Sequence, residues 1–161
     1  MGQIESRLEQ MGLVLPLSLR TSEDVALPFP FVQIHGRRVL ISGHGPQDAD
    51  GRMRGPFGKV GRELTVEEGY ASARVVALSM LGSLKRALGD LDRLGRWCRI
   101  FGMVNSAPGF HQQPAVINGF SELILELYGL DRGSHTRSAV GMAELPFNIP
   151  VEIEGEVELL E

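Results

Sequence analysis

Two residues in the C-terminal part of the sequence could act together on a small anion. Arg137 lies at the start of one predicted strand, 136–145, and Glu152 lies near the start of the next, 151–160. A guanidinium binds a carboxylate through parallel N–H donors, and a nearby carboxylate can move a proton to or from water. The same pair could instead form a cross-strand salt bridge, which stabilises a surface only weakly. Spacing alone favours the salt bridge.

Other motifs with catalytic chemistry are incomplete. Gly43-x-Gly45 lacks the third glycine of a dinucleotide fingerprint, and Gly58-Lys59 lacks the hydroxyl residue that a P-loop requires next. The four histidines are scattered without the spacing of metal ligands. Cys98 is the single cysteine and lies mid-strand among large side chains, which predicts a buried, inert thiol. We therefore expect neither a metal nor a cofactor.

Composition restricts the class of protein. With 161 residues, 43% of them apolar and 22% charged, the chain can form one domain with its own core. The net charge of -4 argues against a dedicated nucleic-acid binder, which needs a surplus of basic residues. No apolar run is long enough to span a membrane, and no export signal is recognisable. A lone cysteine suits a reducing compartment, so we expect a cytoplasmic protein.

The pattern of apolar residues predicts the elements that must position Arg137 and Glu152. Thr65 and Glu68 form a capping box at the start of a long helix, and Gly89 ends that helix. In the last strand, four apolar residues alternate with four glutamates, so one face is apolar and the other acidic. The predicted elements are a helix at 3–11, strands at 31–34 and 38–42, a helix at 65–89, a strand at 97–104 buried on both faces, a helix at 114–129 and strands at 136–145 and 151–160.

This order predicts an α+β fold, a mainly antiparallel sheet with two helices packed on one face. The other face of the sheet then needs a partner, which predicts an oligomer. Residues 1–26 are expected to form an N-terminal helix and lead-in, and residues 27–161 a single domain.

The C-terminal pair lies within a motif that resembles a known family. The segment TRSAVGMAELP, residues 136–146, followed by Val-Glu-Ile at 151–153, resembles the C-terminal signature of the RidA/YjgF family. These are reactive intermediate (enamine/imine) deaminases, often labelled endoribonuclease L-PSP. Shorter likenesses occur in the first strand (30–33), after the second strand (42–44) and in the second long helix (117–118). The resemblance covers roughly residues 27 to 160.

The resemblance implies a chorismate-mutase-like fold, a homotrimer and active sites in the clefts between subunits. Arg137 would hold the carboxylate of a small anionic substrate, and Glu152 would position or activate the hydrolytic water. The implied reaction is hydrolysis of a 2-imino or enamine acid to a 2-keto acid and ammonia, without metal or cofactor. The further residues that would line the substrate cleft are Phe31, Ser42, Gly43, Asn118 and Ala139.

The sequence departs from the family pattern around the arginine. Phe31 replaces a usual tyrosine, and Ala139 replaces the cysteine often found two residues after the arginine. His135 and Glu144 also differ from the residues usual at their positions. The anion-holding arginine is thus retained in an altered pocket. A trimeric module that binds a small carboxylate without turnover is the alternative function, and a ribonuclease fits the acidic net charge least.

Overall fold

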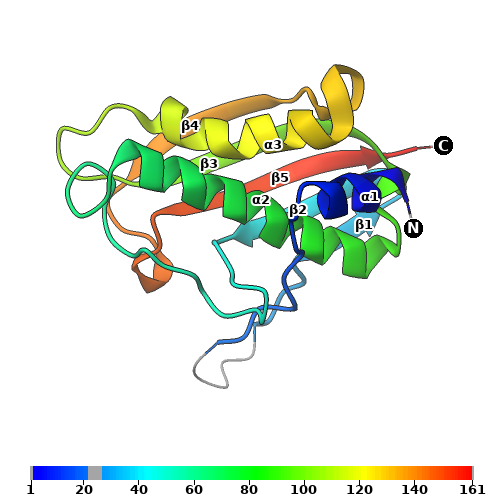
Figure 1. Cartoon of the computed structure of the whole chain (residues 1–161), viewed down its shortest axis with the longest axis horizontal. Coiled ribbons are helices and arrows are strands. Elements are labelled where there is room, and N and C mark those ends of the chain that lie inside the picture. The colour runs from blue at the N-terminus through cyan, green and yellow to red at the C-terminus, as the bar shows by residue number, and fades with distance from the viewer. Residues whose placement is uncertain (1, 22–26, 161) are drawn as a thin grey trace.

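The computed structural model describes residues 2–21 and 27–160, which form one five-stranded sheet with helices on one face (Figure 1). The strand order is β1-β2-β5-β3-β4, and every neighbouring pair is antiparallel except β3 and β4, which are parallel. The predicted α+β class is therefore confirmed. The elements are α1 (Gln3–Gln10), β1 (Val32–His35), β2 (Arg38–His44), α2 (Val66–Leu88), the short η1 (Leu91–Arg93), β3 (Leu94–Asn105), α3 (Gln113–Gly133), β4 (Thr136–Met142), the short η2 (Pro146–Asn148) and β5 (Val151–Leu159).

The ends of the two long helices follow from local chemistry. At the start of α2 the Thr65 hydroxyl accepts from the Glu68 amide at 3.1 Å, and the Glu68 carboxylate accepts from the Thr65 amide at 2.8 Å. Gly89 ends this helix with a left-handed φ of 78°, so the predicted capping box and glycine cap are both confirmed. In α3 the backbone breaks at Gly129 (φ 72°), where the sequence predicts the end, but one further turn runs to Gly133.

The helices pack closely on each other and on the sheet, and this packing fixes the position of α3. A side chain at Gly119 of α3 would clash with the Tyr70 carbonyl oxygen of α2. A Cβ at Gly102 of β3 would lie 2.7 Å from the Ile117 side chain of α3. Both glycines therefore allow a close approach of backbone that larger residues would prevent. The buried Trp97 and Phe120 rings pack edge to face in the core beside them, with centroids 5.7 Å apart.

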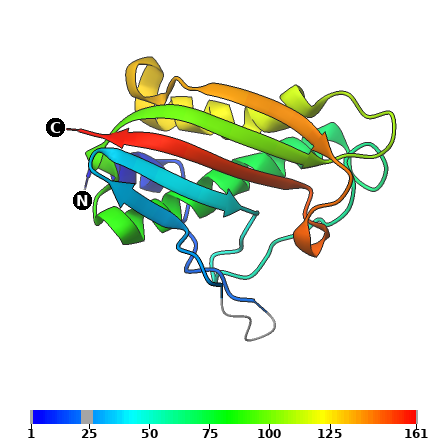
Figure 2. The same cartoon turned by 180° about the vertical axis from the view of Figure 1, so that it is seen from behind.

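No described helix covers the opposite face of the sheet (Figure 2). The four apolar residues of β5 are buried under the helices and the glutamates between them lie on this open face, as the alternation predicts. The prediction that β3 is buried on both faces is wrong, because Arg99 is exposed and Phe101 half-buried on the open side. A second apolar cluster also lies on this face. It consists of Met103, Leu145 and Ile149, with Met53, Phe101, Val140 and Met142 packed against it.

The strands that carry Arg137 and Glu152 are not neighbours. The crossover through α3 places β4 beside β3 in parallel, and β5 then inserts between β2 and β3. The prediction that the two residues lie on adjacent strands is therefore wrong, and a cross-strand salt bridge between them is excluded. The hydrophobic pattern of a strand shows which of its faces is buried but does not show which strand lies beside it.

The predicted N-terminal helix and the lone cysteine can also be placed. Ile4 and Leu8 of α1 are buried in the same core as the long helices. Cys98 is half-buried, and the pKa of its thiol is raised by burial and by the carboxylates of Glu158 and Glu156, which keeps the thiol protonated at neutral pH. Within the described residues, each helix is too short or too polar to cross a membrane.

Candidate functional site

Arg137 points from β4 toward α3, where three acceptors hold its guanidinium. Its Nη2 atom donates to Asn118 Oδ1 at 2.6 Å and to the Pro114 carbonyl at 3.2 Å, and its Nη1 atom donates to Ser121 Oγ at 3.0 Å. Asn118 and Ser121 are three residues apart and therefore share one face of α3. The Nε–H and one Nη1–H group have no acceptor among the described residues. The guanidinium is thus oriented by the protein and keeps donors for an anion.

His135 extends this arrangement. Its Nδ1 atom lies 2.7 Å from the Gly133 carbonyl oxygen, which can only accept, so Nδ1 carries the proton. Its Nε2 atom, 2.9 Å from Ser121 Oγ, then accepts from that hydroxyl. Burial lowers the pKa of His135, which favours this neutral form. Burial also lowers the pKa of Arg137, but a guanidinium stays charged at any physiological pH.

Glu152 lines a cavity of about 230 Å³ beside the end of β2. The carboxylate is half-buried, and no described residue donates a hydrogen bond to it. Burial, together with the charge of Glu154, raises its pKa above the ordinary value. Gly43 makes room for it, since a Cβ there would lie 3.0 Å from Glu152 Cδ. A carboxylate with a raised pKa is a stronger proton acceptor than an ordinary glutamate, which suits a general base.

His44 forms part of the wall of the same cavity and has a structural role. It is 3% exposed, with Nδ1 at 2.6 Å from the Ser42 carbonyl oxygen and Nε2 at 2.9 Å from Ser83 Oγ. Burial lowers its pKa to about 4, so the ring is neutral at pH 7. The Phe31 ring lies against it, with centroids 5.0 Å apart. His44 therefore fixes the backbone at the end of β2 and the position of Phe31.

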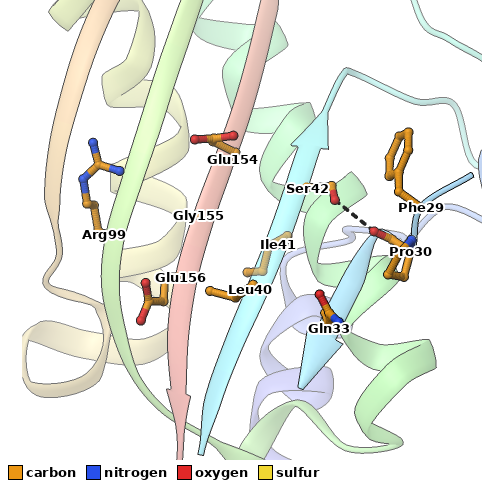
Figure 3. Close-up of a pocket in the computed structure, with 10 residues that line it drawn as sticks. All are labelled: Phe29, Pro30, Gln33, Leu40, Ile41, Ser42, Arg99, Glu154, Gly155 and Glu156. Atoms are coloured by element: carbon orange, nitrogen blue, oxygen red, sulfur yellow. Dashed lines mark hydrogen bonds between the residues drawn. The ribbon is translucent and has the colours of Figure 1, made fainter. Parts of the chain in front are cut away.

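Ser42 lines a neighbouring cavity of about 380 Å³ on the open face of the sheet (Figure 3). Its hydroxyl donates to the Pro30 carbonyl at 2.9 Å. Glu154 and Glu156 project from β5 on this face, and Arg99 lies beyond them on β3. Glu156 is paired with Arg38 at 2.7 Å. The cavity therefore has a mixed polar and apolar lining, and Phe29 lines both this cavity and the one that Glu152 lines.

The structure places most of the predicted site residues in two groups. Arg137, Asn118 and Ala139 lie together on the helix-covered side of the sheet, at the β4 edge. Phe31, Gly43 and Glu152 lie together around the cavity next to β2. Strand β3 separates the groups, and the Arg137 and Glu152 side chains point to opposite faces of the sheet. One chain therefore does not bring the predicted anion holder and the predicted proton carrier together.

Sequence reasoning missed two residues that belong to these groups. Ser121 could have been found, because it follows Asn118 by three residues on a helix. Phe147 lines the Glu152 cavity, but its backbone is left-handed (φ 57°), a conformation that gives no signal in an aromatic residue.

A third group of carboxylates lies away from both. Glu5, Asp90 and Asp92 offer oxygen atoms within 4.8 Å of one another beside α1. Lys85 donates to Glu5 at 2.6 Å and the Leu91 amide donates to it at 3.1 Å. Asp90 accepts from the Asp92 amide at 2.9 Å. These bonds attach α1 to the turn after α2, which is a structural role.

The comparisons with known proteins identify the family. The model of a family described as "YjgF/chorismate mutase-like, putative endoribonuclease" matches residues 5–153. The chain belongs to this YjgF family. Protein TCP17 of Trypanosoma cruzi is 39% identical over 98% of this chain and 95% of its own length. The crystal structure of a "putative endoribonuclease" from Shewanella oneidensis is 30% identical over 98% of this chain and 100% of that chain, with a TM-score of 0.86.

A more distant member of the YjgF fold was crystallised with an amino acid. The structure of TdcF from E. coli with bound serine is 19% identical, covers 89% of this chain and 99% of that chain, and has a TM-score of 0.58. At this identity the likeness shows the fold alone. The YjgF match begins within α1, so it includes most of the N-terminal helix, which lies before the residues 27 to 160 that the sequence resemblance covers.

Proposed function

We propose that this protein hydrolyses 2-imino or enamine acids to 2-keto acids and ammonia, at a site built by two copies of the chain. Arg137 of one copy holds the substrate carboxylate, and Glu152 of the next copy acts on the water. The observation that carries this proposal is the separation of the two groups on opposite faces of the sheet. Arg137 keeps N–H donors for an anion, and Glu152 receives no hydrogen bond from a described residue, so each side chain can act on a substrate bound between two copies. Family membership supports a small-molecule-processing role.

The chemistry that these residues can perform is simple. The free N–H groups of Arg137 hold the carboxylate while Asn118 and Ser121 keep the guanidinium in place. Glu152 takes a proton from water as the oxygen attacks the imine carbon. The same proton then goes to the nitrogen, which gives a neutral carbinolamine. Transfer of the proton of its hydroxyl group to the nitrogen, again through the Glu152 carboxylate, breaks the C–N bond, so that ammonia leaves as the carbonyl of the 2-keto acid forms. Free imines already hydrolyse in water, so positioning and a modest proton transfer suffice.

A homotrimer is the assembly we propose. The uncovered sheet face and its apolar cluster around Met103 and Ile149 support an association of chains through this side. Closed rotational symmetry then repeats the same contact around a ring, so each copy supplies both halves of a site. We propose that this trimer binds a small carboxylate substrate and acts on it in the cytoplasm. The reaction needs neither a metal nor a cofactor.

A trimeric carboxylate-binding module without turnover is the second candidate. It is supported by the alanine at position 139 and the phenylalanine at position 31, which leave the neighbourhood of the predicted site without a thiol or a phenol hydroxyl. Binding of keto acids without imine turnover distinguishes this module from the deaminase.

Mixing two inactive variants tests the proposal. An amino-acid oxidase supplies the imine, semicarbazide traps it, and the protein competes with the trap. Arg137→Ala and Glu152→Gln should each lose the competition. After co-expression in equal amounts, random assembly makes about three trimers in four mixed, and each mixed trimer has one site in three with both an intact Arg137 and an intact Glu152. About a quarter of all sites are then intact, so about a quarter of the activity should return.

Three results would count against the proposal. A wild-type protein that never competes with semicarbazide excludes the deaminase. Full activity in Arg137→Ala excludes the assigned anion holder. Variants that assemble together without regaining activity exclude a site shared between copies.

A further inference from the structure

We infer that the preferred substrates carry a large apolar side chain and that Phe147 determines this specificity. The inference rests on the proposed function, because it assigns the Glu152 cavity to the substituent of the imino acid. It follows from the lining of that cavity and from the backbone that presents Phe147 to it.

The cavity beside Glu152 is apolar apart from this carboxylate. His44 has both ring nitrogens in hydrogen bonds, and the Gln47 amide donates to the Gly51 carbonyl at 3.2 Å. The Glu152 carboxylate is the charged group of the lining, and no described residue donates a hydrogen bond to it. The apolar side chains that line the cavity are Leu19, Leu27, Phe29, Phe31, Met53, Pro146, Phe147 and Ile149.

Phe147 is held in this wall by a strained backbone. Its φ is 57° and that of Asn148 is also 57°, a left-handed conformation that asparagine adopts readily and that is unfavourable for phenylalanine. Hydrogen bonds from the neighbouring segments fix it. The Asn148 carbonyl accepts from the Gly58 amide at 2.9 Å, and Asn148 Oδ1 accepts from the buried Asn105 amide at 3.3 Å. Lys59 in turn donates to Asn105 Oδ1 at 2.8 Å.

This arrangement keeps the aromatic ring of Phe147 exposed at a position where it contributes little to the stability of the fold. Phe147 is 60% exposed, so its ring adds little to the core. Leu27 and Phe29, which line the same cavity, are 39% and 48% exposed. Strained backbone and exposed apolar surface coincide at sites that bind ligands. Apolar side chains in the same cavity as an acidic group fit a ligand that is apolar next to its reacting atom.

The size of the cavity sets the size of the substituent. A cavity of about 150 Å³ with apolar walls is large enough for benzene, and the cavity here measures about 230 Å³. A phenyl or isobutyl group would fill it, whereas the methyl group of 2-iminopropanoate would leave it largely empty. A methylene group in an apolar enzyme pocket changes kcat/KM by roughly tenfold or more.

The test compares imines made by an amino-acid oxidase from phenylalanine, leucine and alanine, in competition with semicarbazide. We expect kcat/KM for the phenylalanine-derived imine to exceed that for the alanine-derived imine by at least about tenfold. Phe147→Ala should remove most of this preference, because kcat/KM for the phenylalanine-derived imine should fall by a larger factor than kcat/KM for the alanine-derived imine. Phe57→Ala is the matched control, because Phe57 is also exposed (45%) and does not line the cavity.

Two additions keep the outcome clear if Phe147→Ala is unstable or if no imine is turned over. Phe147→Gly removes the ring and suits the left-handed backbone. Calorimetric titration with phenylpyruvate and pyruvate measures the same preference without turnover. Turnover or binding that favours the phenyl compound and depends on Phe147 supports the inference.

Turnover with equal or greater rates for the alanine-derived imine overturns the inference and leaves the proposed function standing. A phenyl preference that survives both Phe147 variants overturns the role of Phe147. Absence of both turnover and keto-acid binding overturns the inference together with the proposed function.

Discussion

The substitution Asn118→Asp places a carboxylate where a neutral amide oxygen lies 2.6 Å from Arg137 Nη2. The existing bond already involves a charged guanidinium and belongs to the class that contributes about 1.5–3 kcal/mol. The substitution adds the attraction between two opposite charges in a half-buried site, so Arg137 would gain an internal counter-ion worth roughly 1–2 kcal/mol more than the amide once desolvation is subtracted. A ligand carboxylate must then compete with this counter-ion for the guanidinium. Because 1.4 kcal/mol corresponds to a factor of ten, the Kd for a keto acid should rise roughly five- to thirtyfold.

Calorimetric titration of phenylpyruvate at pH 7 and low ionic strength measures this change, since salt would screen part of the effect. The Tm should stay the same or rise, because the new ion pair lies within the folded chain. Gln10→Glu adds the same charge to an exposed residue of α1 and controls for net charge. An unchanged Kd in Asn118→Asp, with the protein folded, would refute the assignment of Arg137 as the anion holder.

Three further substitutions have defined outcomes. Burial raises the pKa of Glu152, so the folded state is most stable below the unfolded pKa of this group and loses stability as pH rises through the folded pKa. Glu152→Gln should thus have a higher Tm than wild type at pH 7 but not at pH 4. An equal difference in Tm at the two pH values would contradict the raised pKa. Burial lowers the pKa of His44 from 6.5 to about 4, so wild type should lose stability as pH falls across that interval. The Tm of His44→Gln, measured between pH 7 and 4, should fall less steeply than that of wild type. The same pH dependence of Tm in both proteins would exclude the lowered pKa of His44. Gly119→Ala forces a Cβ against the Tyr70 carbonyl oxygen and should lower the free energy of unfolding by about 3 kcal/mol. In a circular dichroism melt this corresponds to a fall in Tm of roughly 6–12 °C. A Tm within about 2 °C of wild type would mean that α2 and α3 move apart at little cost.

Local signals in the sequence were enough for most elements of the fold. The capping box at Thr65 and the alternation in β5 depend on residues close together in the chain, and both are confirmed. The insertion of β5 between β2 and β3 could not be predicted, because alternation assigns faces and not neighbours. The error at β3 has the same origin, since its apolar residues gave no information about which face the helices would leave open.

The candidate site was predictable to a smaller extent. The motif around Arg137 led to Asn118, which the structure places within hydrogen-bonding distance of it. The spacing between Arg137 and Glu152 suggested a contact that the strand order forbids. The apolar wall around Glu152 arises from segments far apart in the chain, and its conformation at Phe147 depends on tertiary bonds to Asn148. Such features have no local pattern to detect.

The central position of β5 has a consequence for synthesis on the ribosome. The hairpin of β1 and β2 and the unit formed by β3, α3 and β4 are made first, but in the native sheet they are joined only through β5. Until residues 151–159 leave the exit tunnel, β2 and β3 each present an unpaired edge, the kind of edge that recruits other chains. A nascent chain that stalls before this point carries both edges, so chaperone protection matters most until β5 can pair with β2 and β3.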